Sequence, residues 1–125
     1  MNTPPFVFQK LFTGTGTYNF LTAEAVATMK LRRSITKWSL QVTGVDASGA
    51  VVAAPTSWTV NLQGSLDGLS YGTAAMLTHT NTVNANGDVV DSAGNFKPRL
   101  GVQINVSALT LGPAAGILVT VEGAP

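Results

Sequence analysis

The chain has 125 residues, which is enough for one domain with its own hydrophobic core. It contains no cysteine, which excludes a disulfide framework, a thiol nucleophile and a thiolate metal site. Its net charge is only +1, so it lacks the basic excess that is typical of nucleic-acid-binding proteins.

The low content of charged residues is the most informative feature of the composition. Only 10% of the residues are Asp, Glu, Lys or Arg, against about 25% in an ordinary soluble domain. The surface must therefore consist largely of Thr, Ser, Asn, Gln, Gly and exposed apolar side chains, which water solvates weakly. Such a surface favours burial against other protein subunits. The alternative is a Thr-rich β-domain that stays a soluble monomer.

The sequence has no feature that predicts insertion in a membrane. No segment reaches the roughly 18 apolar residues of a membrane span, and the first ten residues lack the basic region and apolar run of a secretory signal. We expect the chain to be made in the cytoplasm of the cell that produces it, with neither a membrane nor a nucleic acid as its partner.

At the start of the chain, residues 1–8 have the character of an extended arm, because Pro4 and Pro5 remove two backbone donors and oppose a helix. The sandwich domain is expected over residues 9–125. The one segment that could be helical is 21–31, although an extended conformation with a bend fits it about as well.

Three segments alternate between apolar and polar residues, which is typical of strands with one buried face. Their predicted buried faces consist of Trp38, Leu40 and Val42; of Trp58, Val60, Leu62 and Leu66; and of Leu100, Val102, Ile104 and Val106. The residues between them point the other way and are mostly uncharged, as in Thr59, Asn61, Gln63 and Ser65. Uncharged outward residues again indicate a face that another chain covers.

Five weaker strands are expected at 6–13, 17–22, 73–80, 89–92 and 117–122. Gly, Asn, Asp and Pro turn signals separate the strands, and Asn86-Gly87 is the strongest hairpin signal among them. About eight strands in a small domain predict an all-β, single-domain antiparallel β-sandwich, a jelly roll or a related Greek key. An immunoglobulin-like sandwich is the runner-up, although its Cys pair is missing.

Catalytic residues are not evident in the sequence. His79 is the only histidine, no nucleophile elbow occurs, and the acidic residues lie mostly at turns or strand ends. We expect no enzyme and no cofactor, with His79 as a strand residue that packs or forms hydrogen bonds.

An oxygen-rich stretch at 84–95, NANGDVVDSAGN, is the one place where a cation could bind. Calcium prefers six to eight oxygens including several carboxylates, and this stretch has only two Asp. We therefore expect no metal site there, but a hairpin whose Asn and Asp side chains cap its own backbone.

Four of the seven basic residues lie within eight positions: Lys30, Arg32, Arg33 and Lys37. One hypothesis is a contact patch for an acidic partner surface, since Arg can bind carboxylates through two hydrogen bonds. The other is a solvated strand end or loop.

The segment 58–68, W-T-V-N-L-Q-G-S-L-D-G, is followed by an aromatic residue at Tyr71. This pattern resembles β-sandwich virion proteins of tailed phages and prophages, among them small capsid decoration (cement) proteins and some tail or baseplate components. The resemblance covers roughly residues 37–80, and its S-x-D-G turn also occurs in other sandwich modules, including carbohydrate-binding ones. Gly64 is expected to mark a bulge or a close approach of the backbone.

The resemblance implies a structural protein on the capsid surface that bridges major capsid subunits, as a homo-oligomer and without catalytic residues. The predicted contact residues are Phe6, Val7 and Phe8 in the arm, and Arg32, Arg33 and Lys37 in the basic cluster. A tail, baseplate or head–tail connector subunit is one alternative. A carbohydrate-binding module for host attachment is another, for which Tyr18, Tyr71 and Phe96 would have to offer rings to the sugar.

Overall fold

The computed structural model describes residues 6–19, 35–52, 55–66, 69–94 and 101–124. Within these ranges the chain forms eight strands: β1 (Phe6–Phe12), β2 (Gly16–Asn19), β3 (Lys37–Val45), β4 (Ser57–Ser65), β5 (Leu77–Thr80), β6 (Val89–Asp91), β7 (Gly101–Thr110) and β8 (Gly116–Ala124). Each of the eight predicted strand segments overlaps one of them. The segment that could be helical, 21–31, lies outside the described residues.

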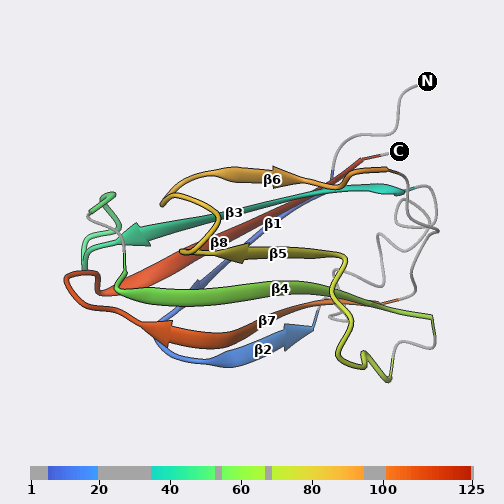
Figure 1. Cartoon of the computed structure of the whole chain (residues 1–125), viewed down its shortest axis with the longest axis horizontal. Helices are drawn as coiled ribbons and strands as arrows, with labels where there is room; N and C mark the ends of the chain where they lie inside the picture. Colours follow the sequence, from blue (N-terminus) through green and yellow to red (C-terminus); the bar gives the residue numbers. More distant parts are fainter. Residues whose placement is uncertain (1–5, 20–34, 53–54, 67–68, 95–100, 125) are drawn as a thin grey trace.

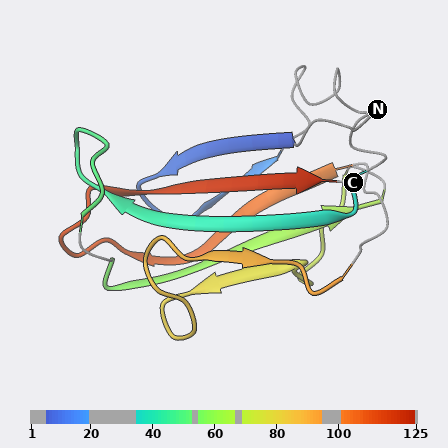
Figure 2. The same ribbon diagram turned by 90° about the horizontal axis from the view of Figure 1, so that it is seen from above.

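The strands form two four-stranded antiparallel sheets that lie face to face (Figures 1 and 2). The first, sheet A, has the order β1-β8-β3-β6, and the second, sheet B, has the order β2-β7-β4-β5. The apolar side chains that the two sheets turn toward each other form one core, so the prediction of a β-sandwich is confirmed.

The strand order identifies the sandwich as a jelly roll. β1 pairs with β8, β2 with β7, β3 with β6 and β4 with β5, all antiparallel. Such pairing arises when a long hairpin with four strands in each arm rolls up. Successive pairs of strands then lie alternately in the two sheets. Of the consecutive strands, only β4 and β5 belong to the same sheet.

The core consists of the predicted apolar faces. Trp38 and Trp58 are 2% and 3% exposed, and Leu40, Val60, Leu62, Val102, Ile104, Val119 and Val121 are fully buried between the sheets. Both tryptophans therefore belong to the core, as their position on apolar strand faces predicts.

Four details of the predicted pattern are wrong. Leu66 follows the last residue of β4 and is 76% exposed, whereas Gln63 and Ser65, which lie on the outer face of sheet B, are each only 3% exposed and not open to water as predicted. Gly64 marks no bulge, because it pairs regularly with Val102 and the irregularity of β4 lies between Thr59 and Val60, opposite β7. A close approach of the backbone at Gly64, the other expectation, stays a prediction.

The Asn86-Gly87 turn does not close a hairpin. It lies in the loop that carries the chain from β5 in sheet B to β6 in sheet A. Gly87 has a φ of 84°, a conformation that favours glycine, and its N–H donates to the carbonyl of Val42 in β3. The sequence thus predicts the turn, but in the fold this turn carries the chain from one sheet to the other.

The first strand begins within the predicted arm. Phe6, Val7 and Phe8 lie in β1 and pair with residues 121–123 of β8, so the sandwich extends at least to Phe6. Residues 1–5, which contain the two prolines, lie outside the described residues.

Candidate protein-interaction surface

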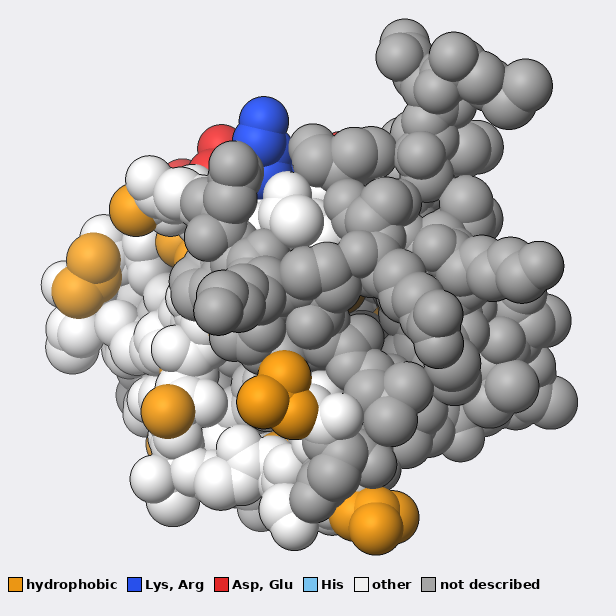
Figure 3. Space-filling model, turned by 90° about the vertical axis from the view of Figure 1, so that its right-hand side faces the viewer, with side chains coloured by type: hydrophobic (Ala, Val, Ile, Leu, Met, Phe, Trp, Pro, Cys, Tyr) orange, Lys and Arg blue, Asp and Glu red, His pale blue; other side chains and the backbone are white. Residues whose placement is uncertain are grey.

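The two sheets differ in their charge. None of the strands β2, β4, β5 and β7 of sheet B contains an Asp, Glu, Lys or Arg residue. The strands of sheet A contain Lys10, Lys37, Asp91 and Glu122. In the end view of Figure 3, the blue and red side chains gather along the upper edge, while white and orange atoms make up most of the rest of the described surface.

The outer face of sheet B, called the neutral face below, consists of amide and hydroxyl side chains. Its members are Thr17, Asn19, Thr59, Asn61, Gln63, Thr78, Thr80, Gln103, Asn105 and Ser107. The register aligns several of them across the sheet, so that Thr17, Asn105, Asn61 and Thr78 form one row over the four strands.

Several side chains of the neutral face bind one another. The Thr78 hydroxyl donates to Asn61 Oδ1 at 2.8 Å, and Gln103 Nε2 donates to Gln63 Oε1 at 2.7 Å. Gln63 Nε2 lies 3.4 Å from the carbonyl oxygen of Gly72. These bonds hold the amides in fixed orientations, so a protein partner would meet an ordered surface. Covering it would bury no ionised group within these strands, which removes the largest desolvation penalty of association.

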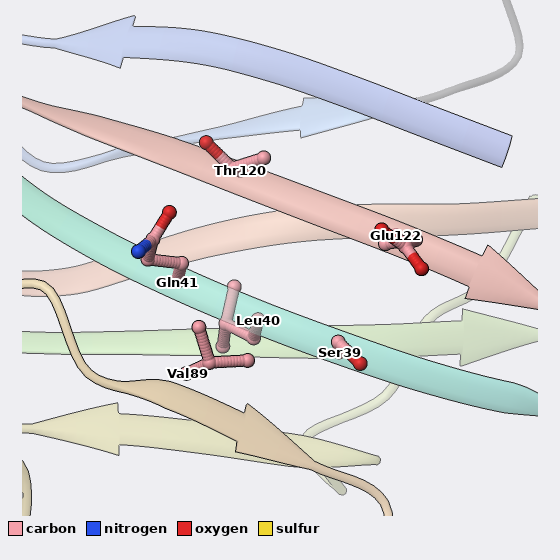
Figure 4. Close-up of a pocket in the computed structure, with 6 residues that line it drawn as sticks. All are labelled: Ser39, Leu40, Gln41, Val89, Thr120 and Glu122. Carbon is pink, nitrogen blue, oxygen red and sulfur yellow. The ribbon is translucent and has the colours of Figure 1, made fainter. Parts of the chain in front are cut away.

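The outer face of sheet A is more varied and has a shallow depression of about 100 Å³ (Figure 4). Its lining residues come from β3, β6 and β8: Ser39, Leu40, Gln41, Val89, Thr120 and Glu122. The Ser39 hydroxyl donates to Asp91 Oδ1, 2.5 Å away, and Gln41 Nε2 donates to the Gly87 carbonyl, 2.9 Å away.

The structure brings together part of the predicted contact set. Phe6 pairs with Gly123 and Lys37 pairs with Ala124, so these two residues lie at the same end of sheet A with β8 between them. Val7 is 57% exposed, and the ring of Phe8 stacks on that of Tyr18 at 5.1 Å. Arg32 and Arg33 lie outside the described residues, so their role as partner contacts stays a prediction.

His79 is a core residue whose ring is held at both nitrogens. It is fully buried, Nδ1 accepts a hydrogen bond of 2.9 Å from the indole N–H of Trp58, and Nε2 lies 3.0 Å from the carbonyl oxygen of Asp88. These partners fix the neutral form with its proton on Nε2, which donates to Asp88. Burial lowers the pKa of His79, against a smaller opposing effect of Asp88.

Asn and Asp side chains of the oxygen-rich stretch bind backbone N–H groups, as predicted, but the stretch closes no hairpin and Asn86 binds a residue of β3 and not the stretch's own backbone. Asn84 Oδ1 accepts from the N–H of Thr80, Asp88 Oδ2 from that of Ala85, and Asn86 Oδ1 from that of Gly44. Among the residues that the structure describes, no three His, Cys, Asp or Glu side chains come together as a metal site.

The aromatic residues that could stack on a sugar are not displayed for it where the structure describes them. One face of the Tyr18 ring stacks on Phe8, and Lys10 Nζ lies 4.9 Å from the centre of the same ring. Tyr71 is half-buried, and Phe96 lies outside the described residues. The geometry therefore gives less support to a sugar-binding platform than to a protein-binding face.

The sequence pattern predicts the neutral face only in part. The alternating Thr, Asn and Gln residues of β4 and β7 predicted an uncharged outer surface strand by strand. Nothing in the pattern shows that β2, β7, β4 and β5 align in one sheet while the strands with charges join the other.

No helix within the described ranges has the length and apolar character needed to cross a membrane.

No protein-family model and no curated protein matches the sequence. Among solved structures, the crystal structure of the SPBc2 prophage-derived protein YomS is similar to this chain, with a TM-score of 0.52. The match covers 100% of this chain and 98% of that one, at 12% sequence identity. At this identity the similarity concerns the fold: over its whole length, the chain shares the overall fold of a protein derived from a prophage.

Proposed function

We propose that this chain is a structural subunit of a tailed-phage or prophage particle, which acts by packing its surfaces against other protein chains. The single observation that carries the proposal is the neutral face, an ordered surface of amides and hydroxyls on four strands without one charged residue. The similarity in fold to a prophage-derived protein supports the viral setting.

The finer form of the proposal is capsid decoration. The neutral face would pack against the outer surface of the shell, and each copy would bridge neighbouring major capsid subunits. A symmetric shell repeats the same weak contact many times, so that avidity replaces high affinity at any one site. Shape and hydrogen bonding would carry specificity, because the face offers no charge for long-range steering.

Two threonines allow a matched test of the neutral face. Thr59 in β4 and Thr43 in β3 are both half-buried and lie on the outer faces of sheet B and sheet A, respectively. We expect Thr59→Lys to weaken binding at least about tenfold, because a buried unpaired ammonium group costs more than the 1.4 kcal/mol that a tenfold loss represents. Thr43→Lys should bind as the unmodified chain does.

The measurement is co-sedimentation of the purified chain with shells assembled from the major capsid protein of the same phage or prophage genome. Circular dichroism of both variants controls for folding. Binding to isolated tails but not to shells would move the role to the tail or baseplate. If neither particle binds the chain, or if Thr43→Lys is the variant that fails, the proposal is wrong.

A further inference from the structure

β1 forms the longest edge in the described part of the sandwich. It has seven residues, whereas the other edge strands, β2, β5 and β6, have four, four and three. Figure 2 shows β1 along one side of sheet A, next to β8, and no described strand pairs with its other side. Edge strands of natural proteins usually carry Pro, a bulge or charged side chains, directed outward or inward, that prevent pairing with other chains.

β1 has only one of these protections, the inward-directed charge of Lys10. It contains neither Pro nor Gly, and it pairs with β8 in an unbroken register. Its one charged residue, Lys10, holds Nζ 4.9 Å from the centre of the Tyr18 ring. Tyr18 lies in β2 of the other sheet, so this ammonium group is turned away from the outer face of sheet A.

The hydrogen-bonding pattern shows which backbone groups of β1 face the open edge. The carbonyl of Ala124 accepts from the N–H of Thr36, next to β3, so the backbone groups of Ala124 point toward β3. Because this direction alternates along a strand, the backbone groups of the even-numbered residues of β8 point toward β3 and those of the odd-numbered residues toward β1. Their partners in β1 are the even-numbered residues Phe6, Phe8, Lys10 and Phe12. Val7, Gln9 and Leu11 therefore direct their N–H and C=O groups away from β8.

We propose that β1 pairs antiparallel with β1 of a second copy, about a two-fold axis at Gln9. In this register Gln9 lies opposite Gln9 of the second copy, and Val7 lies opposite its Leu11. All three pairs use the outward N–H and C=O groups, which gives about six backbone hydrogen bonds, two for each pair. Sheet A would then continue from one copy into the other as a single sheet.

The side chains of the two copies match in this register. Val7 and Leu11 are 57% and 51% exposed and lie on the outer face of sheet A, so each apolar side chain would meet an apolar partner. Gln9 donates to Thr120 Oγ1 at 3.1 Å, which keeps its amide on that same face at the axis. Lys10 would lie opposite Phe8, so no two like charges face each other.

The symmetry of the contact limits it to two copies. Because the axis passes through Gln9, each copy uses the same strand, and the pairing closes without a free β1 edge that could recruit a third copy. The contact leaves the neutral face uncovered, so the dimer does not depend on the proposed virion role.

The absence of cysteine permits a test of the register. In a Gln9→Cys variant the two new thiols would sit on the axis, with Cα atoms about 5.5 Å apart, within the range that a disulfide spans. We expect mild oxidation to convert this variant into a covalent dimer. Val89→Cys, on the opposite edge strand of the same sheet, should stay monomeric on a denaturing gel.

Two valines give a matched pair for the contact itself. Val7 in β1 and Val89 in β6 are both 57% exposed and both lie on the outer face of sheet A, at its opposite edges. Sedimentation velocity should show a dimer for the unmodified chain, at least tenfold weaker dimerisation for Val7→Lys, and no change for Val89→Lys.

The melting temperatures of both lysine variants show whether either has lost its fold. A chain that is monomeric up to its solubility limit would overturn the proposal. A dimer that Val89→Cys crosslinks, or that Val89→Lys disrupts as strongly as Val7→Lys does, would overturn it as well, because another edge would then form the contact. None of these measurements involves a capsid, so their failure leaves the proposed function untouched.

Discussion

His79 joins three segments of the chain through one ring. Trp58 in β4 donates to Nδ1, and Nε2 donates to the carbonyl of Asp88 in the loop before β6. A second proton on the ring would have to occupy Nδ1, the nitrogen that accepts from Trp58. The fold therefore favours neutral His79, in agreement with the lowered pKa that results from its burial.

The free energy of unfolding should consequently fall as the pH drops below about 6.5, the pKa of an unfolded-state histidine. Below this value the unfolded chain binds a proton that the folded chain binds only at lower pH, so acid favours unfolding. Urea unfolding between about pH 8 and pH 5.5 measures the effect above the titration of most carboxylates. His79→Gln, which cannot titrate, should flatten the dependence, and parallel slopes for the two proteins would refute this explanation.

Gly123 is a position where no side chain fits. It pairs with Trp38, and a Cβ atom built there would lie 2.7 Å from Ile35 Cγ2 and 3.1 Å from Trp38 Cζ3. All three residues are buried, so neither neighbour can move into solvent to make room.

Gly123→Ala should therefore lower the free energy of unfolding by about 1–3 kcal/mol, the usual cost of overpacking a core. Gly94→Ala is the matched control, because a Cβ atom there meets nothing within 4 Å. Chemical denaturation followed by tryptophan fluorescence gives both values. Equal stabilities for the two variants would show that the core near Trp38 is looser than described.

At the scale of elements, the loop between β5 and β6 is fastened to sheet A by the Asn86 side chain. Asn86 Oδ1 accepts from the N–H of Gly44, and Nδ2 donates to the carbonyl of Val52 at 3.1 Å. One amide thus connects the β5–β6 loop with the end of β3 and with the segment that follows it.

Asn86→Asp should destabilise the fold by about 1–3 kcal/mol, because a carboxylate oxygen would replace the donor and face the Val52 carbonyl. Asn84→Asp provides the control, since its Oδ1 accepts from Thr80 and an aspartate retains that acceptor. Thermal unfolding at pH 7 compares the two. A larger loss for the Asn84 variant would contradict the assignment.

The long strands could be predicted from the sequence because their two faces differ. β3, β4 and β7 alternate buried apolar and outward polar residues over most of their length, which is the pattern that a sandwich imposes. The end of β4 is harder to predict: Gln63 and Ser65 are buried although they lie on the outer face, and Leu66 is exposed, because local surroundings and not the period decide burial there. The sequence places the start of the edge strand β1 in an arm, because its pairing partner β8 lies more than 100 residues away and leaves no local signal.

At the scale of the whole molecule, the strand order could not be read from local patterns. Consecutive strands mostly belong to different sheets, so turn signals such as Asn86-Gly87 locate a change of direction without naming the neighbouring strand. The neutral face was missed as a unit for the same reason. Its residues come from four strands that become neighbours only when the hairpin rolls up, although the low charge of the whole chain had already indicated a surface of this kind.

The pairing of Phe6 with Gly123 also decides how attachments would project from the molecule. Adjacent strands lie about 4.8 Å apart, so a segment fused before Phe6 and one fused after Ala124 would leave the sandwich side by side from the same end. The opposite end, with the 46–49 turn and the β7–β8 loop, would stay bare. Both attachment points thus lie at one end of the sandwich, which suits the fold to displaying two peptides or labels next to each other.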